Sequence, residues 1–203
     1  MKFLYVTDRS SVGDERFTAI LAALAGAQDL SVQVREKEAT DRECLAWTRL
    51  ARERLGAEVP LYVNRRFDIA LAAEADGVHL PAAGLPLSRV KANTPRGFRV
   101  GVSAHSPAEA IGAIEEGADL VVIGPIFDTP SKRAYGPPLG AAALAQLPPR
   151  AAHAAEVFAI GGIDEQNLSD LDSYRNRISG VAGIRVFQES DDPRAVATRL
   201  CQR

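Results

Sequence analysis

Short runs of apolar and β-branched residues recur along the chain and alternate with longer segments in which apolar residues recur every three or four positions. The short runs predict strands at residues 3–7, 31–36, 60–64, 77–80, 99–104, 119–127, 157–162 and 180–187. The longer segments predict amphipathic helices, most clearly at residues 17–27, 44–56, 67–75 and 106–118. Because the strand runs are almost continuously apolar, we expect a parallel sheet covered on both faces.

Strand and helix alternate eight times, which predicts right-handed parallel crossovers and a single (β/α)8 TIM barrel spanning residues 1–203. The alternative is an open, doubly wound sheet of the Rossmann type. No G-x-G-x-x-G sequence follows the first expected strand, which weakens the dinucleotide-binding version of that alternative. In a barrel, the active site is expected at the C-terminal ends of the strands.

Composition is ordinary for one globular domain: the chain has 203 residues, of which 46% are hydrophobic and 25% charged. The formal net charge of -2 gives no general reason to expect nucleic acid or an anionic membrane as partner. No apolar stretch approaches the roughly 18 residues of a membrane span, and the N-terminal apolar run is too short for a signal peptide. We therefore expect a cytoplasmic protein. Barrels of this size often form homodimers, but no patch in the sequence decides the oligomeric state.

Basic side chains gather at or just after the ends of the expected strands. They are Arg35, Lys37, Arg65, Arg66, Lys132 and Arg185. A barrel mouth lined in this way suits an anionic ligand, most simply a phosphate. Any one of these residues is also compatible with a solvated charged face, so the prediction rests on their shared position.

Two loops add to the prediction of a phosphate site. Gly161 and Gly162 stand between an expected strand and an expected helix, where backbone N–H groups and the helix dipole would favour an anion. The loop at residues 128–140 carries hydroxyl groups and Lys132 on a segment rich in proline and glycine, and it could fold over a ligand. A plain tight turn and a plain surface loop are the alternatives.

Two histidines lie on or beside expected strands. His79 alternates within a strand, and His105 follows one directly. A hydrogen-bonded structural role and a functional role are equally compatible with each of them.

The motifs, taken together and in order, are LYVTDR, VQVREK, N-x-R-x-D-I-A-L, ADGVHL, GVSAHS, GPIFDTPSK, PPLG and AIGGI. With these the chain resembles the thiamine-phosphate synthase/TenI superfamily over most of its length, and the TenI-like branch more closely. The resemblance implies a (β/α)8 barrel, as the periodicity does. It also implies a phosphorylated thiazole as ligand and, for a synthase, an aminopyrimidine methyl pyrophosphate as second substrate.

The resemblance implies roles for individual residues. Contacts to the pyrimidine and its pyrophosphate would fall on Gln33, Arg35, Lys37, Asn64, Ser103 and Lys132. Contacts to the thiazole phosphate would fall on Thr129, Ser131, Gly161 and Gly162. Arg185 replaces a serine of the phosphate site on strand eight, which would strengthen, reshape or block that site.

Two departures concern magnesium. The synthase pattern has one aspartate ligand after strand three and one after strand four, and this chain has Arg65 and Gly84 there. Mg²⁺ prefers oxygen ligands, which neither side chain supplies. We therefore expect no metal ligand and no cofactor, although a conventional synthase would need Mg²⁺.

Three functional hypotheses follow, and the first is a TenI-like thiazole tautomerase with His105 and Lys132 as catalytic candidates. The histidine proposed as catalytic in that branch is replaced here by Pro125, and His105 is its candidate substitute. The second hypothesis is a thiamine-phosphate synthase in which Arg65 neutralises the pyrophosphate. The third is a non-catalytic ligand-binding or regulatory relative. The sequence leaves open whether Arg65 or Arg66 faces the barrel mouth.

Overall fold

The computed structural model describes residues 1–129 and 136–202, and eight strands lie within them. The strands are β1 (Lys2–Val6), β2 (Leu30–Val34), β3 (Leu61–Asn64), β4 (Gly77–Leu80), β5 (Arg99–Ala104), β6 (Leu120–Ile123), β7 (Glu156–Ile160) and β8 (Gly180–Gly183). They follow one another in the sheet in chain order, and this order closes into a barrel. The topology confirms the (β/α)8 fold predicted from the alternation of strands and helices.

Helical segments separate the strands. The α-helices are α1 (Asp14–Ala23), α2 (Asp41–Leu55), α3 (Phe67–Ala72), α4 (Leu87–Ala92), α5 (Pro107–Glu115), α6 (Arg185–Gln188) and α7 (Pro193–Gln202). The 3₁₀ helices are η1 (Arg9–Ser11), η3 (Ala141–Gln146), η4 (Arg150–Ala152) and η5 (Leu168–Tyr174). Within residues 1–129 and 136–202, none of the helices combines the length and the apolar character that crossing a bilayer requires.

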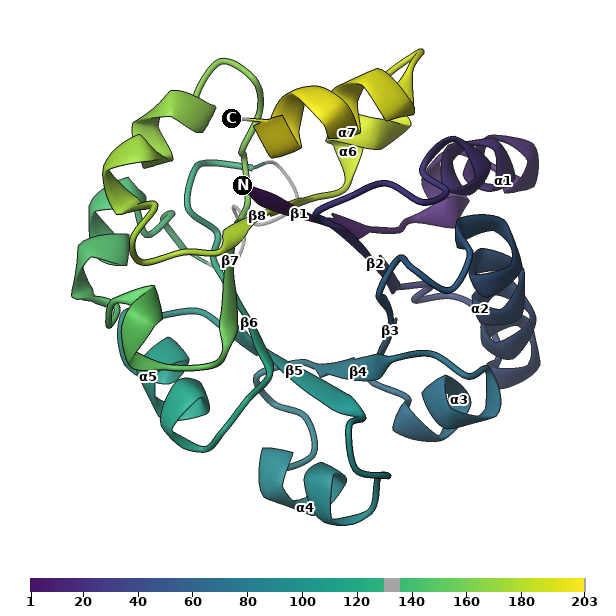
Figure 1. Cartoon of the computed structure of the whole chain (residues 1–203), viewed down its shortest axis with the longest axis horizontal. Coiled ribbons are helices and arrows are strands. Elements are labelled where there is room, and N and C mark those ends of the chain that lie inside the picture. The colour runs from purple at the N-terminus through teal and green to yellow at the C-terminus, as the bar shows by residue number, and fades with distance from the viewer. Residues whose placement is uncertain (130–135, 203) are drawn as a thin grey trace. The chain divides into compact units, whose positions relative to one another are not determined.

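The chain divides into two compact units, each of which is described by itself. The first unit comprises Met1–His79 and Gly183–Arg203, and the second comprises Leu80–Ala182. In the first unit, α1, α2 and α3 lie along one side of β1 to β3 (Figure 1). In the second unit, α5 packs against β5 and β6.

The strand register of the first unit separates a helix-covered face from a polar face. Tyr5 pairs with Val32, and Val32 pairs with Leu61, so these three side chains share one face. The ring of Tyr5 meets the ring of Phe187 in α6, with centroids 5.1 Å apart. Helices therefore cover that face, and Gln33, which follows Val32, points to the opposite one.

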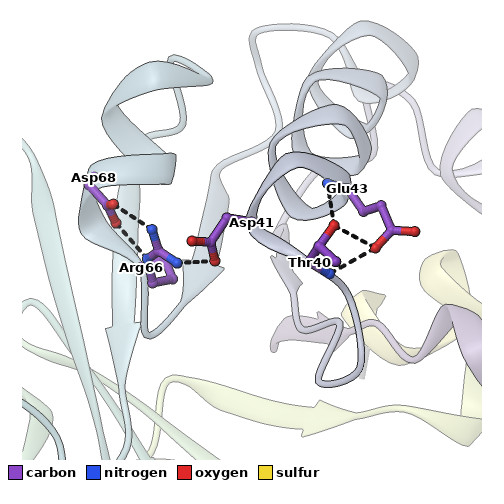
Figure 2. Close-up of polar contacts among 5 residues, drawn as sticks. All are labelled: Thr40, Asp41, Glu43, Arg66 and Asp68. Carbon is purple, nitrogen blue, oxygen red and sulfur yellow. Dashed lines mark hydrogen bonds and ion pairs between the residues drawn. The ribbon is translucent and has the colours of Figure 1, made fainter.

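Caps fix where the helices begin and end. The Thr40 hydroxyl accepts a hydrogen bond from the Glu43 N–H, and the Glu43 carboxylate binds the Thr40 N–H in return, which closes a capping box at the start of α2 (Figure 2). At α5 the Ser106 hydroxyl accepts from the Glu109 N–H, with proline at the first turn, as its sequence predicts. Gly56, with φ of 81°, ends α2 where a helix stop is expected.

Several expected strands end earlier than predicted, and the difference is largest in two of them. The strand expected at 119–127 ends at Ile123, because Pro125 has no N–H to continue the ladder. The strand expected at 180–187 ends at Gly183, and Arg185 begins α6 instead of lying in β8. The helical turn of α6 buries Phe187 against Phe3, with ring centroids 4.9 Å apart. Aromatic burial therefore outweighs the β-propensity of that run.

Candidate active site

Polar side chains share the face of β2 to β4 that lies away from the helices. Gln33 pairs in register with Tyr62, and Asn64, two residues further along β3, pairs with His79. The Gln33 amide Nε2 donates to Asn64 Oδ1 at 3.2 Å. Gln33 and His79 are each only 3% exposed. The C-terminal ends of these neighbouring strands thus present two linked amides beside a buried imidazole.

Arg35 directly follows β2 and carries a partly buried cation. Burial lowers the pKa of its guanidinium, and the carboxylates of Asp8 and Glu36 oppose that shift. Within the described part of the chain, its guanidinium takes part in no ion pair or hydrogen bond. Arginine remains protonated in proteins, so a cation lies at this strand end without a bound carboxylate.

Thr7 and Glu36 fix the backbone around Arg35. The Thr7 hydroxyl donates to Glu36 Oε1 at 2.5 Å and accepts from the Arg35 N–H at 3.0 Å. The second oxygen of Glu36 accepts from the Arg9 N–H at 3.0 Å. Since Thr7 is fully buried, this network joins the loops after β1 and β2 with little competition from water.

His79 is held as a neutral imidazole. Burial lowers the pKa of its ring from 6.5 to about 4, and the positive charge of Arg35 acts in the same direction. A neutral ring can offer one donor and one acceptor at once, whereas an imidazolium offers two donors.

The burial of His79 predicts a loss of stability in mild acid. Between the pKa of about 4 in the folded chain and 6.5 in the unfolded chain, only the unfolded chain binds a proton at this residue. The free energy of unfolding should fall by about 2 kcal/mol from this group as the pH is lowered from 6.5 to 4.5. Urea unfolding at several pH values checks this in the wild type and in His79→Gln. The variant should lose that part of the pH dependence, and an unchanged slope would contradict the assignment.

The turn after β3 separates Arg65 from Arg66. Arg66 forms two hydrogen bonds with the carboxylate of Asp68, at 2.9 and 2.7 Å, and its remaining nitrogen binds Asp41 (Figure 2). These contacts raise the pKa of the Arg66 guanidinium. Arg65 is exposed, and within residues 1–129 and 136–202 its side chain has no recorded polar contact. Arg65 is therefore the one whose charge is available to a ligand.

The residues at the two expected magnesium positions do not fit that ion. Arg65 is a cation, and Gly84 has no side chain. A Cβ atom at Gly84 would lie 2.8 Å from the carbonyl oxygen of Pro81, so this turn is shaped for glycine. Among the described residues, no group of three or more histidine, cysteine or acidic side chains could hold a metal ion.

In the second unit, His105 lies beside the end of β6. Its Nδ1 is 3.0 Å from the carbonyl oxygen of Gly124. Because a carbonyl only accepts, Nδ1 carries the proton and Nε2 holds the lone pair of the neutral ring. The His105 N–H also donates to the Glu109 carboxylate at 2.8 Å. The imidazole is thus fixed next to Pro125, the position of the missing TenI-branch histidine.

Gly161 and Gly162 pack tightly against the segment that follows β6. Their φ angles are 103° and 64°, and added Cβ atoms would lie 2.6 Å from Pro125 Cβ and 2.5 Å from the Asp128 carbonyl oxygen. The N–H of Phe127 donates to the carbonyl of Gly161 at 2.9 Å. Close packing therefore requires both glycines, whatever they bind.

The prediction that a helix begins directly after these glycines, with its dipole directed at an anion, is wrong. Gly162 is followed by turns, and the next helical segment, η5, begins only at Leu168. The Asn167 side chain accepts from the backbone N–H of Asp164, and the Asp164 carboxylate accepts from the backbone N–H of Asn167. These two hydrogen bonds hold the turn that lies between Gly162 and η5. Any anion held here would depend on backbone amides without a helix N-terminus behind them.

The remaining predicted site residues have different placements. Ser103 lies on β5 in register with Val122 and is partly buried. Lys37 is exposed, and Arg185 is exposed at the start of α6. Thr129 is partly buried at the end of the described segment. Ser131 and Lys132 lie outside the described residues.

Sequence reasoning missed Thr7, Glu36, Asp41 and Asp68. Thr7 and Glu36 are 29 residues apart, and the contact between them depends on the parallel register of β1 with β2. Of these contacts, only the pair Arg66–Asp68 has a signal in the sequence. A carboxylate two residues after an arginine can pair with it at the start of a helix.

Comparisons with known proteins identify relatives over the whole fold. The family model described as "Thiamine monophosphate synthase" matches residues 3–187. The thiamine-phosphate synthase of Methanoculleus marisnigri is 39% identical over 202 residues, covering 98% of this chain and 94% of the relative. The thiamine-phosphate synthase of Chloroflexus aurantiacus is 36% identical over 200 residues, covering 96% and 88%.

One solved structure is similar in both fold and sequence. It is the thiamine phosphate pyrophosphorylase from Pyrococcus furiosus, with a TM-score of 0.80 and 27% identity, covering 99% of this chain and 94% of that one. The family match spans most of the chain, and the relatives exceed 30% identity over nearly all of it. The chain belongs to the thiamine monophosphate synthase family.

Proposed function

We propose that this protein is a thiamine-phosphate synthase, which joins an aminopyrimidine methyl pyrophosphate to a thiazole phosphate. The observation that carries the proposal is the linked pair Gln33–Asn64 together with Arg35, whose guanidinium forms no ion pair within the described residues, at the ends of β2 and β3. The names of the relatives support the synthase over the tautomerase expected from the sequence. The loss of carboxylates at Arg65 and Gly84 sets this chain apart from the usual metal-assisted synthase.

The proposed chemistry divides among the described residues by charge. The amides of Gln33 and Asn64 suit the hydrogen-bonding edge of a pyrimidine. As the bond from the methylene carbon to the pyrophosphate oxygen breaks, negative charge grows on pyrophosphate, and the Arg35 guanidinium stabilises it. The thiazole nitrogen then donates its electron pair to the methylene cation, and pyrophosphate is released.

Product formation tests the proposal directly. The pure protein is incubated with both substrates, and thiamine phosphate is measured by chromatography. Condensation above the rate without enzyme is expected. If no product forms although thiazole phosphate binds in calorimetry, the synthase assignment fails and a tautomerase or a binding protein remains.

A thiazole tautomerase is the second candidate, and the contact of His105 with Gly124 favours it. This contact leaves the His105 Nε2 lone pair as a base next to Pro125, in the region of the residue that the chain lacks. The test is isomerisation of the thiazole carboxylate phosphate by the wild type and by His105→Ala. Equal rates in both proteins, or none above background, would refute this candidate.

A further inference from the structure

Arg65 adopts a backbone conformation that arginine rarely takes. Its φ angle is 68°, in the left-handed region where glycine is favoured. The Arg66 N–H donates to the carbonyl of Asn64 at 2.9 Å, so a three-residue turn closes around Arg65. Glycine would occupy this turn without strain. A long cationic side chain in this strained turn points to a use for that side chain.

Three interactions hold the turn from both sides. The Arg65 N–H donates to the carbonyl of His79 at 2.8 Å, which anchors the strained residue to β4. On the other side, Arg66 binds Asp68 at the start of α3 and Asp41 at the start of α2. We name the three side chains Arg66, Asp41 and Asp68 the Arg66 clamp (Figure 2).

The Arg66 clamp gives the two adjacent arginines different electrostatic surroundings. The charge of Arg66 is balanced by two carboxylates, with its side chain 39% exposed. The charge of Arg65 is balanced by no carboxylate in the described part of the chain. Arg65 and Arg35 therefore place two cations, neither of them in an ion pair with a described carboxylate, at the C-terminal ends of the neighbouring strands β3 and β2.

We propose that the Arg66 clamp holds Arg65 in its left-handed turn, and that Arg65 thereby binds the pyrophosphate group of the substrate. The inference rests on the proposed function for the identity of the anion. Arg65 would be a binding residue, and Arg66 a positioning residue that acts through it. A planar guanidinium can take two phosphate oxygens at once and so supplies charge where the chain has no metal-binding carboxylate.

Calorimetric titration of inorganic pyrophosphate into Arg65→Gly tests the first part. Affinity should fall roughly ten- to a hundredfold, the usual loss for one charged hydrogen-bonded contact. The thermal midpoint should stay equal or rise, because glycine relieves the strain. The matched control is Arg42→Ala, which removes an exposed positive charge beside Asp41 and should leave affinity nearly unchanged. Equal affinity in Arg65→Gly and wild type would overturn the inference.

A double-mutant cycle tests whether Arg66 acts through Arg65. In the wild-type background, Arg66→Gln should weaken pyrophosphate binding several-fold. In the Arg65→Gly background, the same change should have no further effect, because the residue to be positioned is gone. Equal effects in both backgrounds would show that Arg66 contributes independently and would overturn its positioning role. Asp68→Asn, which spares both arginines, should reproduce the weaker binding and its dependence on Arg65.

The outcome for the proposed function is decided separately. If pyrophosphate binds through Arg65 but no condensation occurs, the synthase assignment is refuted and the proposed anion site stands. If Arg65→Gly condenses the substrates at the wild-type rate and binds pyrophosphate with unchanged affinity, the proposed role of Arg65 is refuted and the synthase assignment stands.

Discussion

Replacing Arg35 by alanine lowers kcat/KM for condensation by roughly a hundredfold or more on this account. Its guanidinium is partly buried and binds no carboxylate in the described residues, so its charge remains for the leaving pyrophosphate. Partial burial strengthens the interaction, because water screens the charge less than at an open surface. Steady-state kinetics with the pyrimidine pyrophosphate as varied substrate check the result.

Two further variants make the Arg35 result specific. Arg35→Lys keeps the charge but loses the planar fork, and it should recover only part of the rate. Arg42→Ala removes a cation from an exposed position on α2 and should stay close to wild type. If Arg35→Ala and Arg42→Ala have the same kcat/KM, Arg35 is not part of the site.

Substituting alanine for Gly161 should lower the free energy of unfolding by roughly 2–5 kcal/mol. Two costs combine, because the φ angle of 103° disfavours any side chain and the new Cβ would lie 2.6 Å from Pro125 Cβ. The loop after β6 would have to move away from β7. Equilibrium unfolding in urea measures the change.

Gly112 provides the matched control in the same unit. It lies within α5, and an added Cβ would meet no atom within 4 Å. Gly112→Ala should therefore stabilise the protein by about 0.5–1 kcal/mol through helix propensity. If the two substitutions have similar effects, the close contact between the β6 and β7 loops is not as described.

The fold was predictable from local pattern because strand and helix periodicities were clear. The strands at 77–80 and 99–104 have the expected bounds, and the Ser106 cap lies where its sequence places it. Strand ends were less predictable, since apolar composition continues past Ile123 while the backbone ladder does not. Arg185 shows the same limit, because burial of Phe187 decides the local structure.

The sequence predicts which residue types line the candidate site, but it predicts their geometry less well. Gln33, Arg35 and Asn64 follow from strand ends and from the family resemblance. The choice between Arg65 and Arg66 did not, because it depends on a left-handed turn and on two carboxylates from other segments. The support of Arg35 by Thr7 and Glu36 likewise depends on strand register, which no local pattern encodes.

In the proposed synthase, cationic side chains of this chain, Arg35 and Arg65 foremost, would stabilise the departing pyrophosphate in place of a carboxylate-bound metal. The most direct measurement is the rate of thiamine phosphate formation from both substrates with excess chelator and with added Mg²⁺. Condensation is expected to continue in chelator at a rate within a few-fold of that with Mg²⁺. Condensation that stops in chelator and returns on addition of Mg²⁺ would contradict it.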